Sequence, residues 1–235
     1  MNNSIVAIVP AAGGGQRMQL SLPKQYIKIG DVTILEHTLQ KLLSLPLISQ
    51  VVVVISPDDT YFSSLSIANH PQITVTYGGK TRAESVFAGL ELVSEHSWAL
   101  VHDAARPCVT HQDIENLIHT VIKNNCGGIL ATKVTDTIKK AINNLNGIPT
   151  IAETNDRQWL WAAATPQMFN AKLLKDCMIR AKQDHIELTD EASAIEYCNG
   201  HPLLIECRRD NIKVTRKEDL PLATLYLQEQ GYINK

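Results

Sequence analysis

Short apolar segments of strand length recur along the chain, and each is followed by turn residues and a segment of helix length. They lie at residues 5–9, 51–55, 73–75, 98–101 and 129–131. Regular alternation of strands and helices is typical of a parallel sheet. The segment 51–55 is Val-Val-Val-Val-Ile, without the polar alternation of a half-exposed strand. The sequence therefore predicts an α/β fold in which helices cover both faces of a mostly parallel sheet.

Two of the expected helices have clear start signals. Thr33 and Glu36, and again Thr81 and Glu84, have the spacing of a capping box, in which two side chains satisfy the first backbone donors of a helix. The expected elements are helices near 33–44, 81–94, 170–183, 189–198 and 216–229, and further strands near 203–206 and 211–214. We interpret this pattern as a Rossmann-like, mostly parallel twisted sheet with flanking helices.

A protruding β-arm is predicted over residues 134–156. The pattern there changes to alternation rich in threonine around Asn-Gly at 146–147, which is a strong hairpin signal. An isolated two-stranded hairpin is marginally stable in water, so we expect the arm to pack against a second copy and form a homodimer. The 235 residues contain no repeat or linker, and one domain over 1–235 is expected.

Charge and cysteine usage exclude several classes of protein. The net charge of −2 lacks the basic excess that binding to nucleic acid or an anionic membrane surface requires, so neither partner is expected. The five cysteines are widely spaced without a C-x-x-C pair, which argues against a disulfide framework or a zinc site. There is no signal peptide and no apolar stretch of about 18 residues, so a cytoplasmic protein is predicted.

A glycine-rich loop directly after the first strand is the strongest functional signal. Residues 10–18 read Pro-Ala-Ala-Gly-Gly-Gly-Gln-Arg-Met, and Lys24 follows in the same long connection. Glycines let successive backbone N–H groups point at an anion, and Arg17 and Lys24 add positive charge. Ligands of open α/β sheets bind at the carboxyl ends of strands. The loop therefore predicts a site for a polyphosphate.

Spacing excludes two better-known glycine loops. A dinucleotide-binding G-x-G-x-x-G that begins at Gly13 would need glycine at the position of Met18. A Walker A loop that ends in Gly-Lys-Thr at 79–81 would need glycine at the position of Thr74. Neither a Rossmann dehydrogenase nor a P-loop enzyme is therefore predicted.

Four motifs follow one another along the chain: P-A-A-G-x-G-x-R-M with P-K-Q-Y at 10–26, V-H-D-A-A-R-P at 101–107, T-D-E-A-S at 189–193 and N-I-K-V-T at 211–215. In the same order they resemble the motifs of one enzyme family, 2-C-methyl-D-erythritol 4-phosphate cytidylyltransferase. The resemblance implies a nucleotidyltransferase domain that transfers CMP from CTP to 2-C-methyl-D-erythritol 4-phosphate. A phosphate oxygen of the acceptor would attack the α-phosphorus directly, and pyrophosphate and 4-diphosphocytidyl-2-C-methyl-D-erythritol would form.

The resemblance also implies the residues of the site. The catalytic residues, which would stabilise the transition state, are Arg17, Lys24 and Lys213. The nucleotide-binding residues are Pro10, Ala11, Ala12, Gly13, Gly14, Gly15, Gly79, Arg82, Ser85, Asp103 and Ala104. The residues that would bind the acceptor are Arg106, Thr137, Arg157, Thr165 and Thr189.

Asp103 is also the candidate metal ligand. It follows the apolar strand at 98–101, where a carboxylate could hold Mg²⁺ beside the triphosphate. If the strand continues through both residues, His102 and Asp103 point to opposite faces, so His102 is interpreted as a packed histidine and not as a catalytic partner of Asp103.

The sequence leaves three questions open: the subunit served by the arm, the role of Thr189 and the identity of the acceptor. Thr137 and Arg157 flank the arm and could reach the site of the neighbouring subunit, and Thr189 could simply cap the helix that follows it. The acceptor could be ribitol 5-phosphate, because ribitol-phosphate cytidylyltransferases share the phosphate loop. A catalytically silent nucleotide-binding regulator is disfavoured, because the implied catalytic residues are all present.

Overall fold

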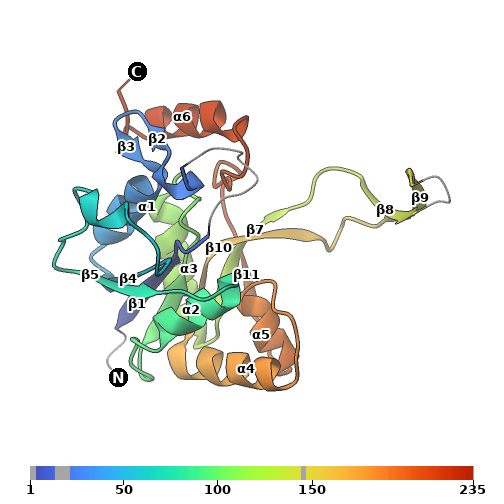
Figure 1. Ribbon diagram of the computed structural model, residues 1–235. Helices are drawn as coiled ribbons and strands as arrows, with labels where there is room; N and C mark the ends of the chain where they lie inside the picture. Colours follow the sequence, from blue (N-terminus) through green and yellow to red (C-terminus); the bar gives the residue numbers. More distant parts are fainter. Residues whose placement is uncertain (1–3, 14–21, 144–146, 235) are drawn as a thin grey trace.

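A seven-stranded sheet forms the centre of the computed structural model, which describes residues 4–13, 22–143 and 147–234. In order across the sheet, the strands are β11 (Leu203–Glu206), β7 (Gly128–Lys133), β10 (Trp161–Asn170), β6 (Trp98–Val101), β1 (Ile5–Pro10), β4 (Ile48–Ile55) and β5 (Ile73–Tyr77). Strand β10 runs antiparallel to both of its neighbours, and the other described pairs in this sheet are parallel (Figure 1). The predicted α/β class is confirmed.

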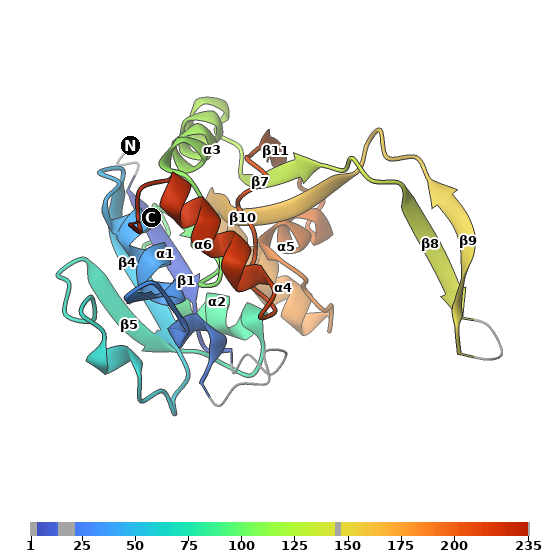
Figure 2. The same ribbon diagram turned by 90° about the horizontal axis from the view of Figure 1, so that it is seen from above.

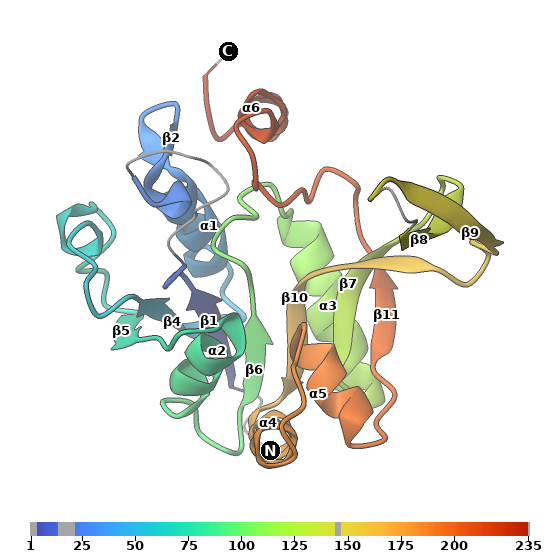
Figure 3. The same ribbon diagram turned by 45° about the vertical axis from the view of Figure 1, so that its right-hand side comes forward.

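Helices cover both faces of the sheet (Figure 3). Those on one face are α1 (Ile34–Leu43) and α3 (His111–Asn124), and those on the other are α2 (Arg82–Leu90), α4 (Ala171–Gln183) and α5 (Glu191–Tyr197). Along β1, Ile5, Ala7 and Val9 pack in the hydrophobic core on the side of α1 and α3, whereas Val6 and Ile8 pack in the core on the side of α2, α4 and α5. Because both faces of the strand are buried, its sequence reads as a continuous apolar run.

The two predicted capping boxes are present. Thr33 is the N-cap of α1 and Thr81 that of α2, and each exchanges hydrogen bonds with the glutamate three residues later. Helix α2 ends at Leu90, earlier than the expected residue 94. Helix α5 begins at Glu191 and is capped by Asp190, so the interpretation of Thr189 as the cap is wrong.

The strand expected at 211–214 is absent from the described structure, and this prediction is wrong. The segment does not pair as a strand but links β10 to the loop after β6: Asn211 Nδ2 donates to Thr165 O at 2.9 Å, and the amide of Val214 donates to Ala105 O at 2.8 Å. The helix expected from 216 begins later, as α6 (Asp219–Glu229). The residues before it form turns instead: the amide of Asp219 donates to Arg216 O and that of Leu220 donates to Lys217 O, both at 3.1 Å.

Strand β10 and helix α3 were not among the elements placed from the sequence. Strand β10 carries Thr-Pro-Gln at 165–167, and its pairing with β7 is irregular between Ala163 and Gln167. A polar interruption of this kind hides a strand from a search for apolar runs. Inserting β10 between β6 and β7 brings Thr165 and Gln167 next to the end of β6.

The predicted arm is present as the antiparallel pair β8 (Ile138–Asn143) and β9 (Pro149–Asn155). It projects away from the body of the molecule, and residues 144–146 lie outside the described chain (Figure 2). Shorter elements at the opposite side are η2 (Lys24–Tyr26), β2 (Lys28–Ile29), β3 (Val32–Thr33) and η3 (Phe62–Ser64). Among the described helices, none is long and apolar enough to cross a bilayer.

Candidate functional site

A pocket of about 430 Å³ opens where β1 and β6 end and α2 begins. This volume is within the range of small-molecule sites. The residues expected to bind the nucleotide or to act in catalysis that line this pocket are Pro10, Ala11, Ala12, Gly13, Lys24, Gly79, Arg82, Ser85, Asp103, Ala104 and Lys213. Gly14, Gly15 and Arg17 lie outside the described residues.

A second pocket of about 300 Å³ lies next to the first and is lined partly by β10 and by the start of α5. It contains three of the five residues expected to bind the acceptor, which are Arg106, Thr165 and Thr189. Arg82, Asp103 and Lys213 line both pockets, and they therefore form the boundary between them.

Thr137 and Arg157 do not line either pocket within this chain. Both side chains are exposed at the base of the arm, where Arg157 donates from Nη1 to the carbonyl of Thr135. A single chain therefore does not bring these two residues to the other expected acceptor ligands.

Three cationic side chains surround Asp103. Its Oδ2 lies 2.7 Å from Lys213 Nζ and 3.7 Å from Arg106 Nε, and its Oδ1 lies 3.0 Å from Arg82 Nε. Burial alone would raise the pKa of Asp103, but these charges, that of Arg82 foremost, lower the pKa well below its ordinary value. Asp103 is therefore an anion at neutral pH and holds three cations at the boundary of the pockets.

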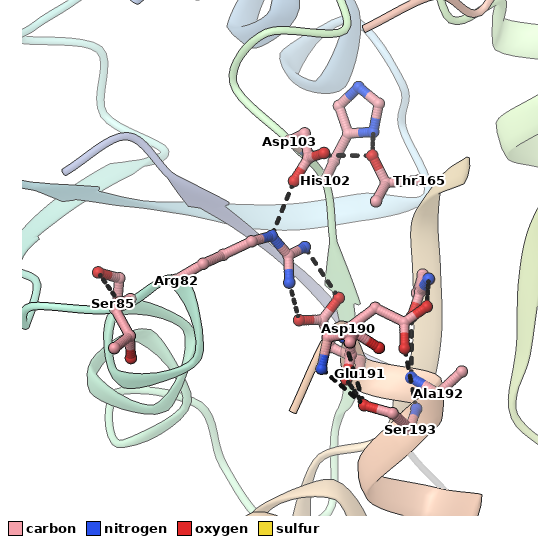
Figure 4. Close-up of polar contacts among 12 residues, drawn as sticks. Arg82, Ser85, His102, Asp103, Thr165, Asp190, Glu191, Ala192 and Ser193 are labelled. Carbon is pink, nitrogen blue, oxygen red and sulfur yellow. Dashed lines mark hydrogen bonds and ion pairs between the residues drawn. The ribbon is translucent and has the colours of Figure 1, made fainter. Parts of the chain in front are cut away.

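Arg82, the first residue of α2, bridges Asp103 and Glu191 (Figure 4). Its Nη1 and Nη2 donate to the two carboxylate oxygens of Glu191 at 2.6 and 3.0 Å. Burial would lower the pKa of Arg82, but Glu191 and then Asp103 raise it above the ordinary value. The guanidinium therefore stays charged between two carboxylates.

Thr165 fixes the backbone of Asp103. Its Oγ1 accepts a hydrogen bond from the Asp103 amide at 3.0 Å and lies 3.0 Å from His102 Nδ1. His102 is fully buried, and its Nε2 lies 3.1 Å from the carbonyl of Arg106. Burial lowers the pKa of His102 to about 4, so the ring is neutral at pH 7. His102 is a packed histidine, as predicted, but the alternation of strand side chains is not the reason, because β6 ends at Val101.

Lys24 reaches the pocket because η2 is anchored to the loop after β1. The buried Gln25 donates from Nε2 to the carbonyl of Ala11 at 2.7 Å. Lys24 Nζ in turn lies 3.4 Å from the carbonyl of Val214, the residue after Lys213. Two lysines that are distant in sequence are thus brought to one wall of the pocket.

Two glycines allow the turn before α2 to pack closely, Gly78 against α2 and the loop after β1, and Gly79 against α2. A Cβ on Gly78 would lie 2.5 Å from Ser85 Oγ and 2.7 Å from the Cβ of Ala12, and a Cβ on Gly79 would lie 2.6 Å from the side chain of Glu84. Larger residues at these two positions would push the turn away from the pocket.

Asp103 is the only carboxylate among the described residues that line the larger pocket. No group of three or more His, Cys, Asp or Glu side chains that could hold a metal occurs in the described ranges. Mg²⁺ is often bound by one or two carboxylates together with substrate phosphates, so a single carboxylate beside the loop predicted to bind a polyphosphate fits this ion.

Several lining residues were not among those expected from the sequence. In the larger pocket they are Gln25, Lys80, Thr81, Ala105 and Thr215, and in the smaller one Ala163, Ala164, Gln167 and Asp190. Lys80 could have been found, because it follows the glycine pair after β5 in the same way that Arg17 follows the first glycine loop. The residues of β10 could not, because that strand was not recognised.

Comparison with known proteins agrees with the motifs. The family model of 2-C-methyl-D-erythritol 4-phosphate cytidylyltransferase matches residues 5–229. A curated protein of that name from Escherichia fergusonii is 53% identical over 226 residues, which cover 96% of this chain and 94% of the relative. One from Enterobacter is 52% identical over 230 residues, covering 98% of this chain and 96% of that protein.

Solved structures show the same relationship. The crystal structure of the Francisella tularensis 2-C-methyl-D-erythritol 4-phosphate cytidylyltransferase superposes with a TM-score of 0.80 at 34% identity, covering 95% of this chain and all of that one. A structure of a 4-diphosphocytidyl-2C-methyl-D-erythritol synthase has a TM-score of 0.82 at 38% identity, with 97% and 99% covered. Motifs, fold and pockets agree with these matches, and the chain belongs to the family of 2-C-methyl-D-erythritol 4-phosphate cytidylyltransferases.

Proposed function

We propose that this chain transfers CMP from CTP to 2-C-methyl-D-erythritol 4-phosphate, with CTP in the larger pocket and the acceptor in the smaller one. The observation that carries the proposal is that Arg82, Asp103 and Lys213 line both pockets. The α-phosphate of CTP and the phosphate of the acceptor must meet, and these side chains lie where the two binding sites adjoin.

In this reaction an oxygen of the acceptor phosphate attacks the α-phosphorus, the bond from the α-phosphorus to the bridging oxygen breaks, and pyrophosphate leaves with that oxygen. Two anionic groups approach each other, so the site must supply positive charge. Lys24, Lys80, Arg82 and Lys213 line the larger pocket. Preorganised cations stabilise the charge that develops in such a transition state and align the reactants, without a nucleophile from the protein.

We assign Lys213 and Lys24 to the stabilisation of the reacting phosphate, and Arg17 to the same task. Lys213 is held by Asp103, and Lys24 lies beside Val214. Gly13 and Gly79, with the residues that adjoin them in the pocket wall, are assigned to nucleotide binding, and Gly14 and Gly15 are assigned with them.

Mg²⁺ is proposed as the divalent cation of the reaction, with Asp103 as its protein ligand and oxygens of the triphosphate as the others. When bound, this ion would neutralise part of the charge of the triphosphate. Asp103 would then serve the ion while it continues to orient Lys213 and Arg82.

The arm is proposed to form a homodimer and to bring Thr137 and Arg157 to the acceptor pocket of the neighbouring subunit. The support is that both lie at the base of a projecting hairpin and away from the pockets of their own chain. The arm also exposes large apolar side chains, namely Ile142, Ile151 and, close to its base, Trp159. Exposed apolar side chains gathered on one projection are typical of a protein interface.

A reducing compartment such as the cytoplasm is proposed as the location of the protein. All five cysteines are free thiols in the structure, including the buried Cys108, Cys177 and Cys207. Proteins of oxidising compartments usually pair their cysteines.

The proposed function is tested by CTP-dependent release of pyrophosphate, with 2-C-methyl-D-erythritol 4-phosphate and ribitol 5-phosphate compared as acceptors at equal concentration. We expect a much larger kcat/KM with the methylerythritol phosphate. A preference for ribitol 5-phosphate would overturn the choice of acceptor, and CTP binding without release of pyrophosphate with either acceptor would favour the silent regulator.

A further inference from the structure

Glu191 takes no direct part in the proposed reaction, yet it is one of the most deeply buried charged residues of the site. Its side chain is 1% exposed, and both of its carboxylate oxygens accept hydrogen bonds from Arg82. Burying a carboxylate is costly unless a well-oriented partner compensates for the lost hydration. The position of Glu191 therefore calls for an explanation in terms of what Arg82 does.

We propose that Glu191 is a positioning residue for the transfer reaction: it fixes the guanidinium of Arg82 so that Arg82 holds Asp103 opposite Lys213. This inference rests on the proposed function, because it concerns the geometry of the boundary between the two pockets. Glu191 itself lines neither pocket and is not expected to touch a substrate.

The hydrogen bonds of Arg82 support this role. A guanidinium carries five N–H donors in a fixed plane. Asp103 takes the Nε donor at 3.0 Å, and Glu191 takes one donor from each terminal nitrogen at 2.6 and 3.0 Å. With the two ends of the group fixed, the plane of the guanidinium cannot rotate without breaking charge-assisted hydrogen bonds. The side chain of Arg82 remains 29% exposed, so it is still accessible from the pockets.

Glu191 is in turn held by the sheet. Gln167 of β10, which is 1% exposed, accepts a hydrogen bond from the Ala192 amide at 2.9 Å and donates to Asp190 Oδ2 at 2.9 Å. Asp190 also caps α5 by accepting from the Ser193 amide at 2.9 Å. These bonds fasten the first turn of α5 to β10, and Glu191 is the residue of that turn that points to Arg82 (Figure 4).

The same contacts connect residues that line one pocket to residues that line the other. Asp190 and Gln167 line the acceptor pocket, Arg82 lines both pockets, and Glu191 connects the two groups of residues. A displacement of the α5 turn by the acceptor would thus be transmitted to Arg82 and from there to Asp103. The ion pair of Glu191 and Arg82 therefore keeps the side chains at the boundary of the two pockets in fixed relative positions.

The simpler alternative is that the pair only stabilises the packing of α5 against α2. Both interpretations predict a less stable protein when Glu191 is changed. They differ in what happens to the turnover of the molecules that remain folded, and in whether the effect of Glu191 depends on the presence of Arg82.

The test uses Glu191→Gln, which keeps the size of the side chain but removes its charge. The matched control is Glu196→Gln, the same change at an exposed position of the same helix. For each protein we would measure the folded fraction by circular dichroism, kcat and KM for CTP and 2-C-methyl-D-erythritol 4-phosphate, and CTP affinity by calorimetry. We expect kcat per folded molecule to fall about 10- to 100-fold in Glu191→Gln, because small misplacements of reacting groups have effects of this size.

CTP affinity should not fall below that of the wild type, since Arg82 keeps its charge and removing a negative charge does not weaken attraction to a triphosphate. Glu191→Asp should restore part of the lost turnover, because it returns the charge on a shorter side chain. A Glu191→Gln variant whose kcat per folded molecule equals that of Glu196→Gln would overturn the inference. Absence of pyrophosphate release by the wild-type enzyme would instead contradict the proposed function.

A double-mutant cycle keeps the inference testable if Glu191→Gln alone folds poorly. Arg82→Met removes the partner, and Glu191→Gln in that background removes both buried charges together. If Glu191 acts through Arg82, the second change should cost little further turnover relative to Arg82→Met. An additional loss as large as that expected in the wild-type background would show that Glu191 acts independently of Arg82, and the inference would be wrong.

Discussion

Lys213 Nζ lies 2.7 Å from Oδ2 of Asp103, although the two residues come from distant parts of the chain. Asp103 follows β6, and Lys213 lies in the irregular segment that precedes α6. Lys213 stands between Ile212 and Val214 in the sequence, and an ammonium between apolar residues needs an anionic partner. Asp103 is that partner, and the contact places the lysine at the boundary between the two pockets.

Lys213→Met is expected to lower kcat by about 10²-fold or more, because a preorganised charge donor to a developing negative charge has an effect of this size. The matched control is Lys217→Met, since Lys217 is exposed four residues further along. Turnover is measured by pyrophosphate release with CTP and acceptor at saturation. A folded Lys213→Met enzyme as active as Lys217→Met would rule out this role for Lys213.

Lys24→Ala tests the other lysine of the pocket wall. We expect a loss of about 10²-fold in kcat/KM for CTP, because Lys24 lines the larger pocket and faces the site proposed for the triphosphate. Lys28→Ala is the control: Lys28 is exposed on β2, and surface changes alter stability by only about 0.5 kcal/mol. Similar kinetics of the two variants would contradict the assignment of Lys24.

Much of the nucleotide side of the site could be predicted from the sequence. The loop after β1, the glycines before α2 and Asp103 after β6 all follow strands, and ligands of parallel sheets bind at those strand ends. Because each of these segments directly follows a strand, the sequence indicates that they lie close together in space.

The network around Asp103 could not be predicted in the same way. Glu191 comes directly after Thr-Asp in the sequence, and nothing in that context distinguishes a buried ion pair with Arg82 from the solvated acidic first turn of a helix. The pairing depends on β10, whose Gln167 positions α5. Strand β10 is antiparallel and has a polar interruption, so neither alternation nor an apolar run reveals it.

A subunit-mixing experiment tests whether Arg157 acts in the site of the partner. Differently tagged Arg157→Ala and Lys213→Met chains are co-expressed, and the mixed dimer is purified through both tags. If Arg157 serves the other subunit, one site of the mixed dimer combines an intact Lys213 with an intact Arg157. We therefore expect about half of the wild-type turnover, because one of two symmetric sites is complete.

A mixed dimer of Lys24→Ala and Lys213→Met is the matched control for this experiment. Both lysines line the pocket of one chain, so neither site of that dimer is complete and activity should stay low. Low activity of the Arg157→Ala and Lys213→Met dimer as well would show that Arg157 does not act across subunits. A wild-type protein that is monomeric by light scattering would contradict the proposed role of the arm.

Lys41 provides a prediction about stability that is independent of catalysis. Its side chain on α1 is fully buried, donates from Nζ to the Val109 carbonyl at 3.0 Å and to Gln230, and lies 4.3 Å from the centre of the Tyr232 ring. Lys41 thus connects α1 to the chain that follows α6. Burial lowers the pKa of Lys41 from 10.5 to about 8.

The sign of the pH effect follows from proton binding. Below pH 8 Lys41 is charged in the folded and the unfolded chain, and the cost of burying that charge is fully present. Between pH 8 and 10.5 the folded chain releases this proton first, so the unfolded chain binds more protons and the free energy of unfolding rises with pH. A shift of this size corresponds to a rise of up to about 3 kcal/mol.

Urea unfolding of the wild type and of Lys41→Met from pH 7 to 10.5 isolates this contribution, because the other titrating groups cancel in the difference between the two free energies. We expect the wild type to gain stability relative to Lys41→Met as the pH rises above about 8. The control is Lys123→Met at an exposed position of α3, for which the difference should not depend on pH. A difference for Lys41→Met that also stays constant would mean that Lys41 keeps its proton in the folded protein, and that the contacts with Val109, Gln230 and Tyr232 fully compensate for its burial.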